Sequence, residues 1–308
     1  MGRYLARRLL QAIPVLLGVT ILIHYLVFSL PGDPIQALAG DKRVDPTVAA
    51  MLREQYHLDE PWLVQYWYYL SGIFTGDLGE TYTGRAVADI VAERFPVTVK
   101  LALTAFVIEA VIGVLAGIVA ALRKGGFLDS LVLVSTLVLV SLPTFVSGAV
   151  LQLLLGVQWP ILPVASVDEG WPRSYILPGF VLASISMAYI SRLTRTSMME
   201  TMRADYVRTA VAKGLGRRRV VGLHALRNAL IPIVTFLGVD LGFLMGGAII
   251  TERVFNLPGI GGQLADSVYL REGPVVVGLI TLMVVVFLLA NLIVDMLYAV
   301  LDPRIRYE

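Results

Sequence analysis

Cysteine is absent from this sequence, and histidine and lysine are scarce. Without cysteine, the chain can form no disulfide, thiolate nucleophile or cysteine-ligated metal site. The three histidines (His24, His57 and His224) lie far apart, and the sequence contains no His-Glu-x-x-His motif, so no metal site is expected. None of the four lysines is followed by Ser or Thr, which excludes a P-loop for ATP, and there is no Gly-x-Ser-x-Gly nucleophile motif. We therefore expect no catalytic residues and no cofactor bound by this chain.

Charge is also sparse. Only 16% of the 308 residues are charged and 57% are hydrophobic, whereas soluble domains carry about 25% charged residues and 45–50% apolar ones. The mean hydropathy is +0.76. A net charge of +2 is too small to indicate a nucleic-acid partner. The excess of apolar side chains predicts an integral membrane protein.

Long apolar runs predict an all-α bundle of six transmembrane helices. A spanning helix needs about 20 predominantly apolar residues to cross about 30 Å of hydrocarbon. The fourth of the predicted spans is the weakest, because it is short and rich in serine. The six spans are Leu9–Leu30, Val99–Leu122, Leu128–Val157, Ile176–Ile190, Ala229–Ile250 and Val275–Leu301.

The basic residues predict the orientation of these spans. Short segments rich in Lys and Arg stay in the cytoplasm. Such segments lie before the first span, between spans two and three, between spans four and five, and after span six. The segment between spans four and five carries nine basic residues. The alternation predicts that both termini are cytoplasmic. It leaves Pro31–Thr98 outside, where a cluster of Trp and Tyr residues indicates either an interfacial aromatic belt or a docking lobe for an extracytoplasmic partner.

The first apolar run has a second interpretation as a signal peptide cleaved after Ala37-Leu38-Ala39. Its apolar core is about 22 residues long, whereas the apolar core of a signal peptide has about 7–15 residues. Cleavage would also break the six-span alternation. We therefore interpret this run as a membrane helix that is retained.

The cytoplasmic stretch Asp205–Gly216 has the pattern of a short amphipathic helix. An apolar face is predicted at helical spacing, and glycines mark its end. The face lacks the large side chains of a helix that lies on lipid headgroups, so we expect it to dock into a groove on a second protein. The residues of this face are Val207, Ala210, Val211, Gly214 and Leu215.

This stretch resembles the EAA loop of bacterial ABC importer permeases, whose coupling helix sits in a cleft of the ATPase subunit. Ala210 and Gly214 match the second Ala and the Gly of the family pattern, whereas Arg208 and Thr209 replace its Glu and first Ala. Leu226-Arg227 also stands where many members have Leu-Pro. The resemblance implies that the ATPase-coupling residues are Arg208, Thr209, Ala210, Lys213, Gly214, Leu215 and Gly216.

The resemblance extends along the whole chain to the dipeptide/oligopeptide/nickel branch, and to its first permease subunit of the dipeptide permease B type. The matching segments lie, in order, at the amino terminus, in the outer segment, after the coupling segment, in the last outer loop and at the carboxyl end. They include Arg7-Arg8-Leu9-Leu10, Leu30-Pro31-Gly32-Asp33-Pro34, Gly76-Asp77-Leu78-Gly79, Arg227-Asn228-Ala229-Leu230-Ile231-Pro232, Pro258-Gly259 and Asp302-Pro303-Arg304.

The same resemblance implies the domain boundaries. The first helix and outer lobe would occupy residues 1–94, a type I ABC importer permease domain 95–301, with the coupling helix at about 203–222, and a cytoplasmic tail 302–308.

Membership of that branch would imply a multi-pass protein of the bacterial cytoplasmic membrane that works with other chains. These are a paralogous permease subunit in a heterodimer, two ATPase domains that hold ATP and Mg, and an extracytoplasmic substrate-binding protein. The expected solutes are di- and oligopeptides, with nickel chelates, haem, glutathione or another small solute as alternatives. A passive channel or an intramembrane enzyme is the alternative from another class. A channel needs no coupling helix, and an enzyme would need a catalytic motif.

Polar residues inside the predicted spans are candidates for the solute path. A charge at the bilayer centre costs about 2.5–3.5 kcal/mol on insertion scales, so such groups face the bundle interior. The candidates are Glu109, Asp240 and Asn291, with Asp295 nearer the cytoplasmic interface. The alternative is a structural role, in which Glu109 is protonated or paired with another helix.

Small residues at four-residue spacing predict close helix packing, or a sliding contact, at Gly238, Gly242 and Gly246.

Overall fold

The protein is described here by a computed structural model that covers residues 2–28, 35, 45–164, 167, 169–246 and 248–301. Throughout these residues the regular structure is helical, with one isolated bridge between Glu80 and Ala86. The chain divides into two compact units, Met1–Thr98 with Pro258–Glu308, and Val99–Leu257. The first boundary falls inside α5 (Val87–Ile108).

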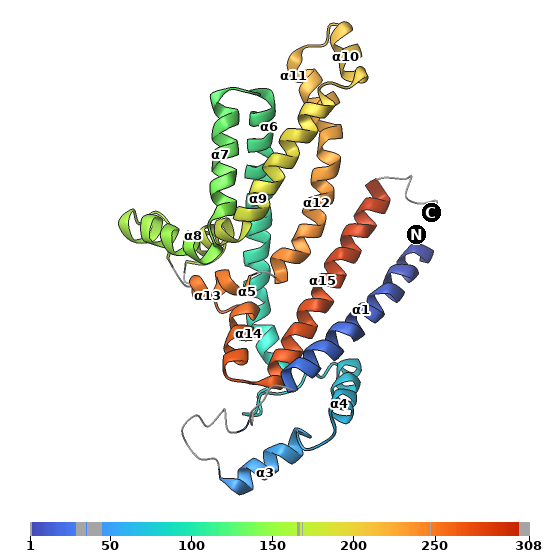
Figure 1. Ribbon diagram of the computed structural model, residues 1–308, viewed down its shortest axis with the longest axis vertical. Coiled ribbons are helices and arrows are strands. Elements are labelled where there is room, and N and C mark those ends of the chain that lie inside the picture. The colour runs from blue at the N-terminus through green and yellow to red at the C-terminus, as the bar shows by residue number, and fades with distance from the viewer. Residues whose placement is uncertain are drawn as a thin grey trace. The chain divides into compact units, whose positions relative to one another are not determined.

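The first unit is built on a pair of long antiparallel helices, α1 (Gly2–Phe28) and α15 (Gly273–Leu301) (Figure 1). A Cβ added at Gly273 would lie 3.1 Å from Val27, so the start of α15 lies beside the end of α1. The helix ends near Gly2 and Leu301 therefore lie on the same side. The unit also contains α3 (Pro46–Gln55), α4 (Trp62–Thr75), the start of α5 and α14 (Ile260–Tyr269).

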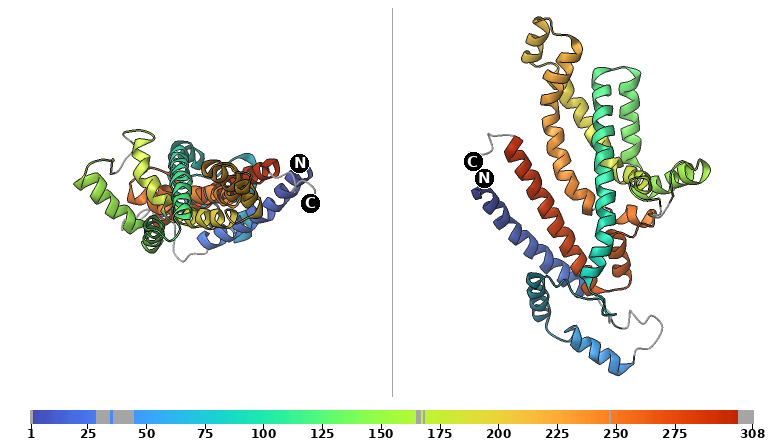
Figure 2. Two further views of the ribbon diagram at one scale, coloured as in Figure 1. Left: turned by 90° about the horizontal axis from the view of Figure 1, so that it is seen from above. Right: turned by 180° about the vertical axis from the view of Figure 1, so that it is seen from behind.

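The second unit is organised around α9 (Arg173–Thr201), which contacts α6, α7 and α12 (Figure 2). It contains the rest of α5, a π-helical segment Glu109–Gly113, α6 (Val114–Leu122), α7 (Phe127–Ser141), α8 (Thr144–Leu151) and a second π-helical segment Gln152–Gln158. After α9 come α10 (Asp205–Ala212), α11 (Arg217–Arg219), a third π-helical segment Val220–Leu226, α12 (Arg227–Gly246) and α13 (Ile249–Val254).

The structure confirms a bundle of five to six apolar membrane-spanning helices. Five described helices are long and apolar enough to cross a membrane, and α7 with the following helix Thr144–Gln158 forms a sixth candidate that is bent by 108°. Gly113, at the end of the first π-helical segment, and Gly117 in α6 lie against residues 187–194 of α9 in the same order along the chain, so α6 and α9 are parallel. The chain between them must return across the bundle, which makes the bent pair one crossing.

Three of the predicted spans need correction. The predicted third span is not one straight helix, because the chain breaks at Leu142-Pro143, and proline removes a backbone donor and clashes with the preceding turn. The fourth is much longer than predicted and runs to Thr201, so Arg192 and Arg195 belong to the helix and not to a loop. The fifth ends at Gly246, and Ile250 belongs to α13.

Some predictions concern residues whose structure is not described. The Leu30–Pro34 motif, the possible cleavage site at Ala37–Ala39 and the tail 302–308 lie outside the described residues, as does the side chain of Asp295. The predicted domain boundary at residue 94 stays a prediction. The compact units divide the chain elsewhere, because the last helix joins the first in one unit.

Candidate functional site

The predicted coupling segment forms a helix, although it is shorter than expected. α10 begins at Asp205, whose backbone oxygen accepts a hydrogen bond from the Thr209 hydroxyl (2.9 Å), and it ends at Ala212. Gly214 has a φ of +78°, the left-handed conformation in which glycine commonly terminates helices. The amide of Gly214 donates to the carbonyl of Val211 (2.9 Å). A side chain at this position would be strained, which explains why glycine follows the helix.

The apolar face of α10 packs inside the chain. Val207 and Ala210 are only 2% and 6% exposed, and they form a cluster with Val220, flanked by Met202 and Leu215. Val207 and Ala210 are therefore covered by the chain itself, and the predicted coupling role of Ala210 stays a prediction. The π-helical segment Val220–Leu226 packs against α10 and covers the part of the predicted face that Val207 and Ala210 form.

The remaining surface of α10 is solvent-accessible and basic. Arg208, Thr209, Lys213, Gly214 and Gly216 are all exposed, and Val211 is 58% exposed. A hydrogen bond from the Asn228 amide to the Tyr206 hydroxyl (3.0 Å) ties this surface to the start of α12. The role of Arg208, Thr209, Lys213, Gly214 and Gly216 in ATPase coupling remains a prediction.

Two of the predicted path residues come together inside the second unit. Glu109, at the start of the first π-helical segment, is fully buried and interacts with the carboxyl group of Asp240 in α12. The Ser186 hydroxyl of α9 donates to Asp240 Oδ1 (3.0 Å). Neither Glu109 carboxyl oxygen has a hydrogen-bond partner among the described residues, and Asp240 Oδ2 has none either. The sequence analysis identified both acids, but not Ser186.

Three helical elements therefore converge on a small polar cluster that consists of Glu109, Asp240 and Ser186. π-Helical insertions such as the one at Glu109 often occur at functional sites. The cluster fits a polar wall of a solute path, and it also fits the alternative of a structural link between helices.

The other candidates behave differently. Asn291 belongs to the first unit, and its amide donates to the Phe287 carbonyl one turn earlier (2.9 Å). Gly242 is buried and Gly238 is half-buried, consistent with close packing of α12. Gly246 is exposed, and an added Cβ would meet no atom within 4 Å among the described residues. A packing role for Gly246 would therefore need lipid or another subunit.

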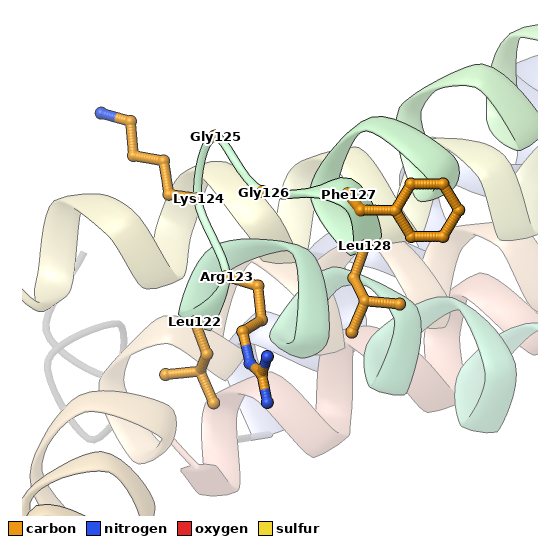
Figure 3. A pocket seen from close by; sticks show the side chains of 7 residues that line it. All are labelled: Leu122, Arg123, Lys124, Gly125, Gly126, Phe127 and Leu128. Atoms are coloured by element: carbon orange, nitrogen blue, oxygen red, sulfur yellow. The ribbon is translucent and has the colours of Figure 1, made fainter.

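An ion pair that the sequence analysis missed joins α7 to α9. Arg195 donates to both carboxylate oxygens of Asp129 (2.6 and 2.8 Å), and the Gly125 amide also donates to Asp129 Oδ2 (2.8 Å). The pair fixes the turn between α6 and α7 that lines an open pocket (Figure 3). In this view the Lys124 ammonium points away from the helices.

Among the described residues, no group of three or more His, Asp or Glu side chains could hold a metal ion.

Comparison with known proteins identifies the family. Residues 113–307 match the family of binding-protein-dependent transport system inner membrane components, and residues 1–102 match the amino-terminal region of such membrane components. The chain is 41% identical to the glutathione transport system permease protein GsiC of Escherichia coli (strain K12) over 309 aligned positions that cover all of both chains. Identity to the GsiC protein of Salmonella typhimurium (strain LT2) is 40% over the same full length.

These matches confirm the family resemblance, the inner-membrane location and a transport function in place of an enzymatic one. The chain belongs to the binding-protein-dependent transport system inner membrane components and is a permease subunit of an ATP-binding-cassette importer.

Proposed function

We propose that this permease imports short peptides, including glutathione, with energy from ATP hydrolysed by separate subunits. The observation that carries this proposal is the full-length similarity to permeases named for glutathione transport. Glutathione is itself a tripeptide, so it falls within the peptide class that the sequence motifs indicate. The Glu109–Asp240–Ser186 cluster supplies polar groups within an otherwise apolar bundle, as a path for a zwitterionic solute requires.

The proposed machine contains four kinds of component. This chain pairs with a homologous permease, two ATPase domains bind ATP and Mg on the cytoplasmic side, and an extracytoplasmic protein delivers the solute. Both termini and α10 would face the cytoplasm, following the distribution of basic residues. The exposed surface of α10 around Arg208, Thr209 and Lys213 would contact the ATPase domains, and the Tyr206–Asn228 hydrogen bond would pass movement to α12.

The first experiment measures ATP-driven uptake of labelled glutathione and of a labelled dipeptide by the complete transporter in proteoliposomes. We expect the double variant Arg208→Glu/Lys213→Glu to lose uptake by about tenfold or more, because charge reversal at a complementary interface costs several kcal/mol. The matched control is Lys124→Glu, which reverses an exposed charge in the α6–α7 turn and outside α10. The control variant should transport as the native protein does.

The two readouts separate the parts of the proposal. If neither glutathione nor the dipeptide is taken up, but another solute stimulates ATP hydrolysis, the proposed substrate class is wrong. If solute is transported and the double variant equals the control, the coupling surface lies elsewhere. Assembly of the purified complex, checked by size-exclusion chromatography, shows whether the charge reversals act on binding of the ATPase domains or on a later step.

A further inference from the structure

A cavity of about 270 Å³ lies within the first unit, where the outer segment meets the ends of α1 and α15. His24 and Phe28 at the end of α1 contribute one wall, and Pro274 and Val277 at the start of α15 contribute another. The rest comes from the α3–α4 connection, α4 and the segment Asp77–Glu80. The cavity therefore belongs to one compact unit, and neither the proposed coupling surface nor the buried polar cluster contributes to it.

The walls of the cavity are aromatic. The His57 ring stacks on the Tyr68 ring, with centroids 4.2 Å apart and planes 10° from parallel. Tyr56 and Tyr69 also line the cavity, and the hydroxyl group of each is already hydrogen-bonded, to the Thr81 carbonyl and to Thr281. The hydroxyl groups of Tyr56 and Tyr69 are therefore engaged, which leaves their aromatic rings for contact with a ligand. The faces of aromatic rings attract cations through their negative electrostatic potential.

The charge of the lining is negative. Asp77 and Glu80 line the cavity, and within the described part of the chain no Lys or Arg side chain does so. One oxygen of Asp77 accepts a hydrogen bond from the Gly79 amide (2.8 Å), which leaves the second oxygen available. Burial raises the pKa of Tyr56, with a further contribution from the Glu80 charge, and burial raises the pKa of Tyr69 to about 12. Both phenols therefore stay neutral at physiological pH, and the two carboxylates determine the charge.

One buried polar atom in this cavity lacks a partner. His24 is only 2% exposed, and its Nδ1 makes no hydrogen bond within the described part of the chain. Its ring is held by Phe28, Tyr66 and Tyr69, with centroids 4.5–5.7 Å away. Buried polar atoms are nearly always satisfied, so an orphan that lines a cavity points to a missing ligand. A ligand with N–H donors would satisfy an unprotonated imidazole nitrogen.

We propose that this cavity binds a small organic cation, an ammonium or guanidinium group on an aliphatic stem. The charged group lies between the carboxylates of Asp77 and Glu80 and the aromatic rings, and the stem extends along the rest of the cavity wall. Such a group belongs either to a free solute or to a Lys or Arg side chain of an extracytoplasmic protein. The cation site does not depend on the proposed peptide substrate, because binding can be measured without transport.

The test uses the complete transporter in nanodiscs and n-butylammonium as the probe, with n-butanol as its uncharged counterpart. Ligand-observed NMR titration measures the Kd of each compound. We expect n-butylammonium to bind and n-butanol to bind at least about tenfold more weakly, because both the ring faces and the carboxylates favour a cation. Equal binding of the two compounds would overturn the proposal.

Variants locate the site. Asp77→Asn/Glu80→Gln should raise the Kd for n-butylammonium by about tenfold, and Tyr68→Leu should raise it also, because each removes part of the cation's surroundings. Asp89→Asn is the matched control, since Asp89 is an exposed acid of the same unit outside the cavity. If the double variant does not fold, the single variant Glu80→Gln carries the same prediction. Unchanged binding in the carboxylate and Tyr68 variants would contradict the proposal.

The source of the cation is distinguished by two further measurements with the native transporter and the Asp77→Asn/Glu80→Gln variant. A free solute is indicated if n-butylammonium raises the KM for uptake in the native protein only. A partner side chain is indicated if n-butylammonium weakens association of the substrate-binding protein in the native protein only. Either result supports a functional cation site. Binding of n-butylammonium with no effect on uptake or association would show an adventitious site and overturn the functional claim.

Discussion

Two glycines of α6 and its preceding π-helical segment let that helix approach the backbone of α9. A Cβ added at Gly117 would lie 2.5 Å from both the Ser191 carbonyl oxygen and Thr194 Cβ. A Cβ at Gly113 would lie 3.0 Å from the Met187 carbonyl oxygen. Small residues at four-residue spacing predict such a close approach, but the spacing does not say which helix is the partner.

We predict that Gly117→Ala destabilises the protein by about 1–3 kcal/mol, the usual cost of forcing additional atoms into a packed interior. The contacts are with backbone and with a β-carbon, so no flexible side chain can move aside. Thermal unfolding of the purified protein in detergent measures the effect as a lower Tm.

The matched control for this prediction is Gly18→Ala. Gly18 also lies within a membrane helix, but an added Cβ there would meet no atom within 4 Å. Alanine has the higher helix propensity, so this variant should keep or slightly raise the Tm. A Gly117→Ala protein with the same Tm as the Gly18→Ala protein would show that α6 and α9 are not in backbone contact.

At the scale of helices, the Asp129–Arg195 pair is the polar link that holds the α6–α7 turn against the end of α9. The two side chains are 5% and 19% exposed, and the two short hydrogen bonds form a bidentate contact. The two residues are 66 positions apart, so no local sequence pattern links them. Sequence reasoning also ended the fourth span at Ile190, which left Arg195 in a loop.

We predict that Asp129→Asn destabilises the protein more than the double variant Asp129→Asn/Arg195→Gln does. Removing one partner of the pair leaves the other charge uncompensated, whereas removing both charges is often close to neutral. A double-mutant cycle on unfolding free energies gives the coupling between the two residues. Additive effects of the two substitutions would show that the pair contributes no interaction energy.

Sequence reasoning predicted elements better than it predicted what covers them. Apolar runs located the membrane helices, because each run must be long enough to cross the hydrocarbon. The break at Pro143 lies inside one such run, and composition averaged over the run hid it. Helical spacing identified the apolar face of α10, but spacing cannot say whether that face is buried by another chain or by the chain's own residues such as Val220.

The buried polar cluster shows a similar limit. The cost of a charge in hydrocarbon predicted that Glu109 and Asp240 face the interior, and the structure brings their carboxyl groups together. Ser186 carried no signal, because a serine in a membrane helix can satisfy its hydroxyl on its own backbone. Only the antiparallel packing of α9 and α12 shows that its hydroxyl faces Asp240.

At the scale of the whole transporter, import requires two states in which the solute path opens to opposite sides of the membrane. If Glu109, Asp240 and Ser186 line that path, water must reach the cluster in one of the two states. In the other state, water is excluded from the cluster or reaches it from the opposite side of the membrane. A purely structural cluster would stay closed to water throughout. The absence of cysteine makes this difference measurable, because any introduced cysteine is the only one in this chain.

We predict that Ser186→Cys reacts with a membrane-impermeant methanethiosulfonate reagent at rates that differ by about tenfold between the nucleotide-free and the ATP-trapped transporter, since reaction requires access of water to the thiol. Ser186 is half-buried beside Asp240 and so lies at the margin of the cluster. The control is Ser191→Cys, which is 1% exposed on the same helix, beside Gly117 in the α6–α9 contact, and should stay unreactive in both states. Equal rates for Ser186→Cys in the two states, or no reaction in either, would place the solute path away from this cluster and leave it as a structural link between α9, α12 and the segment at Glu109.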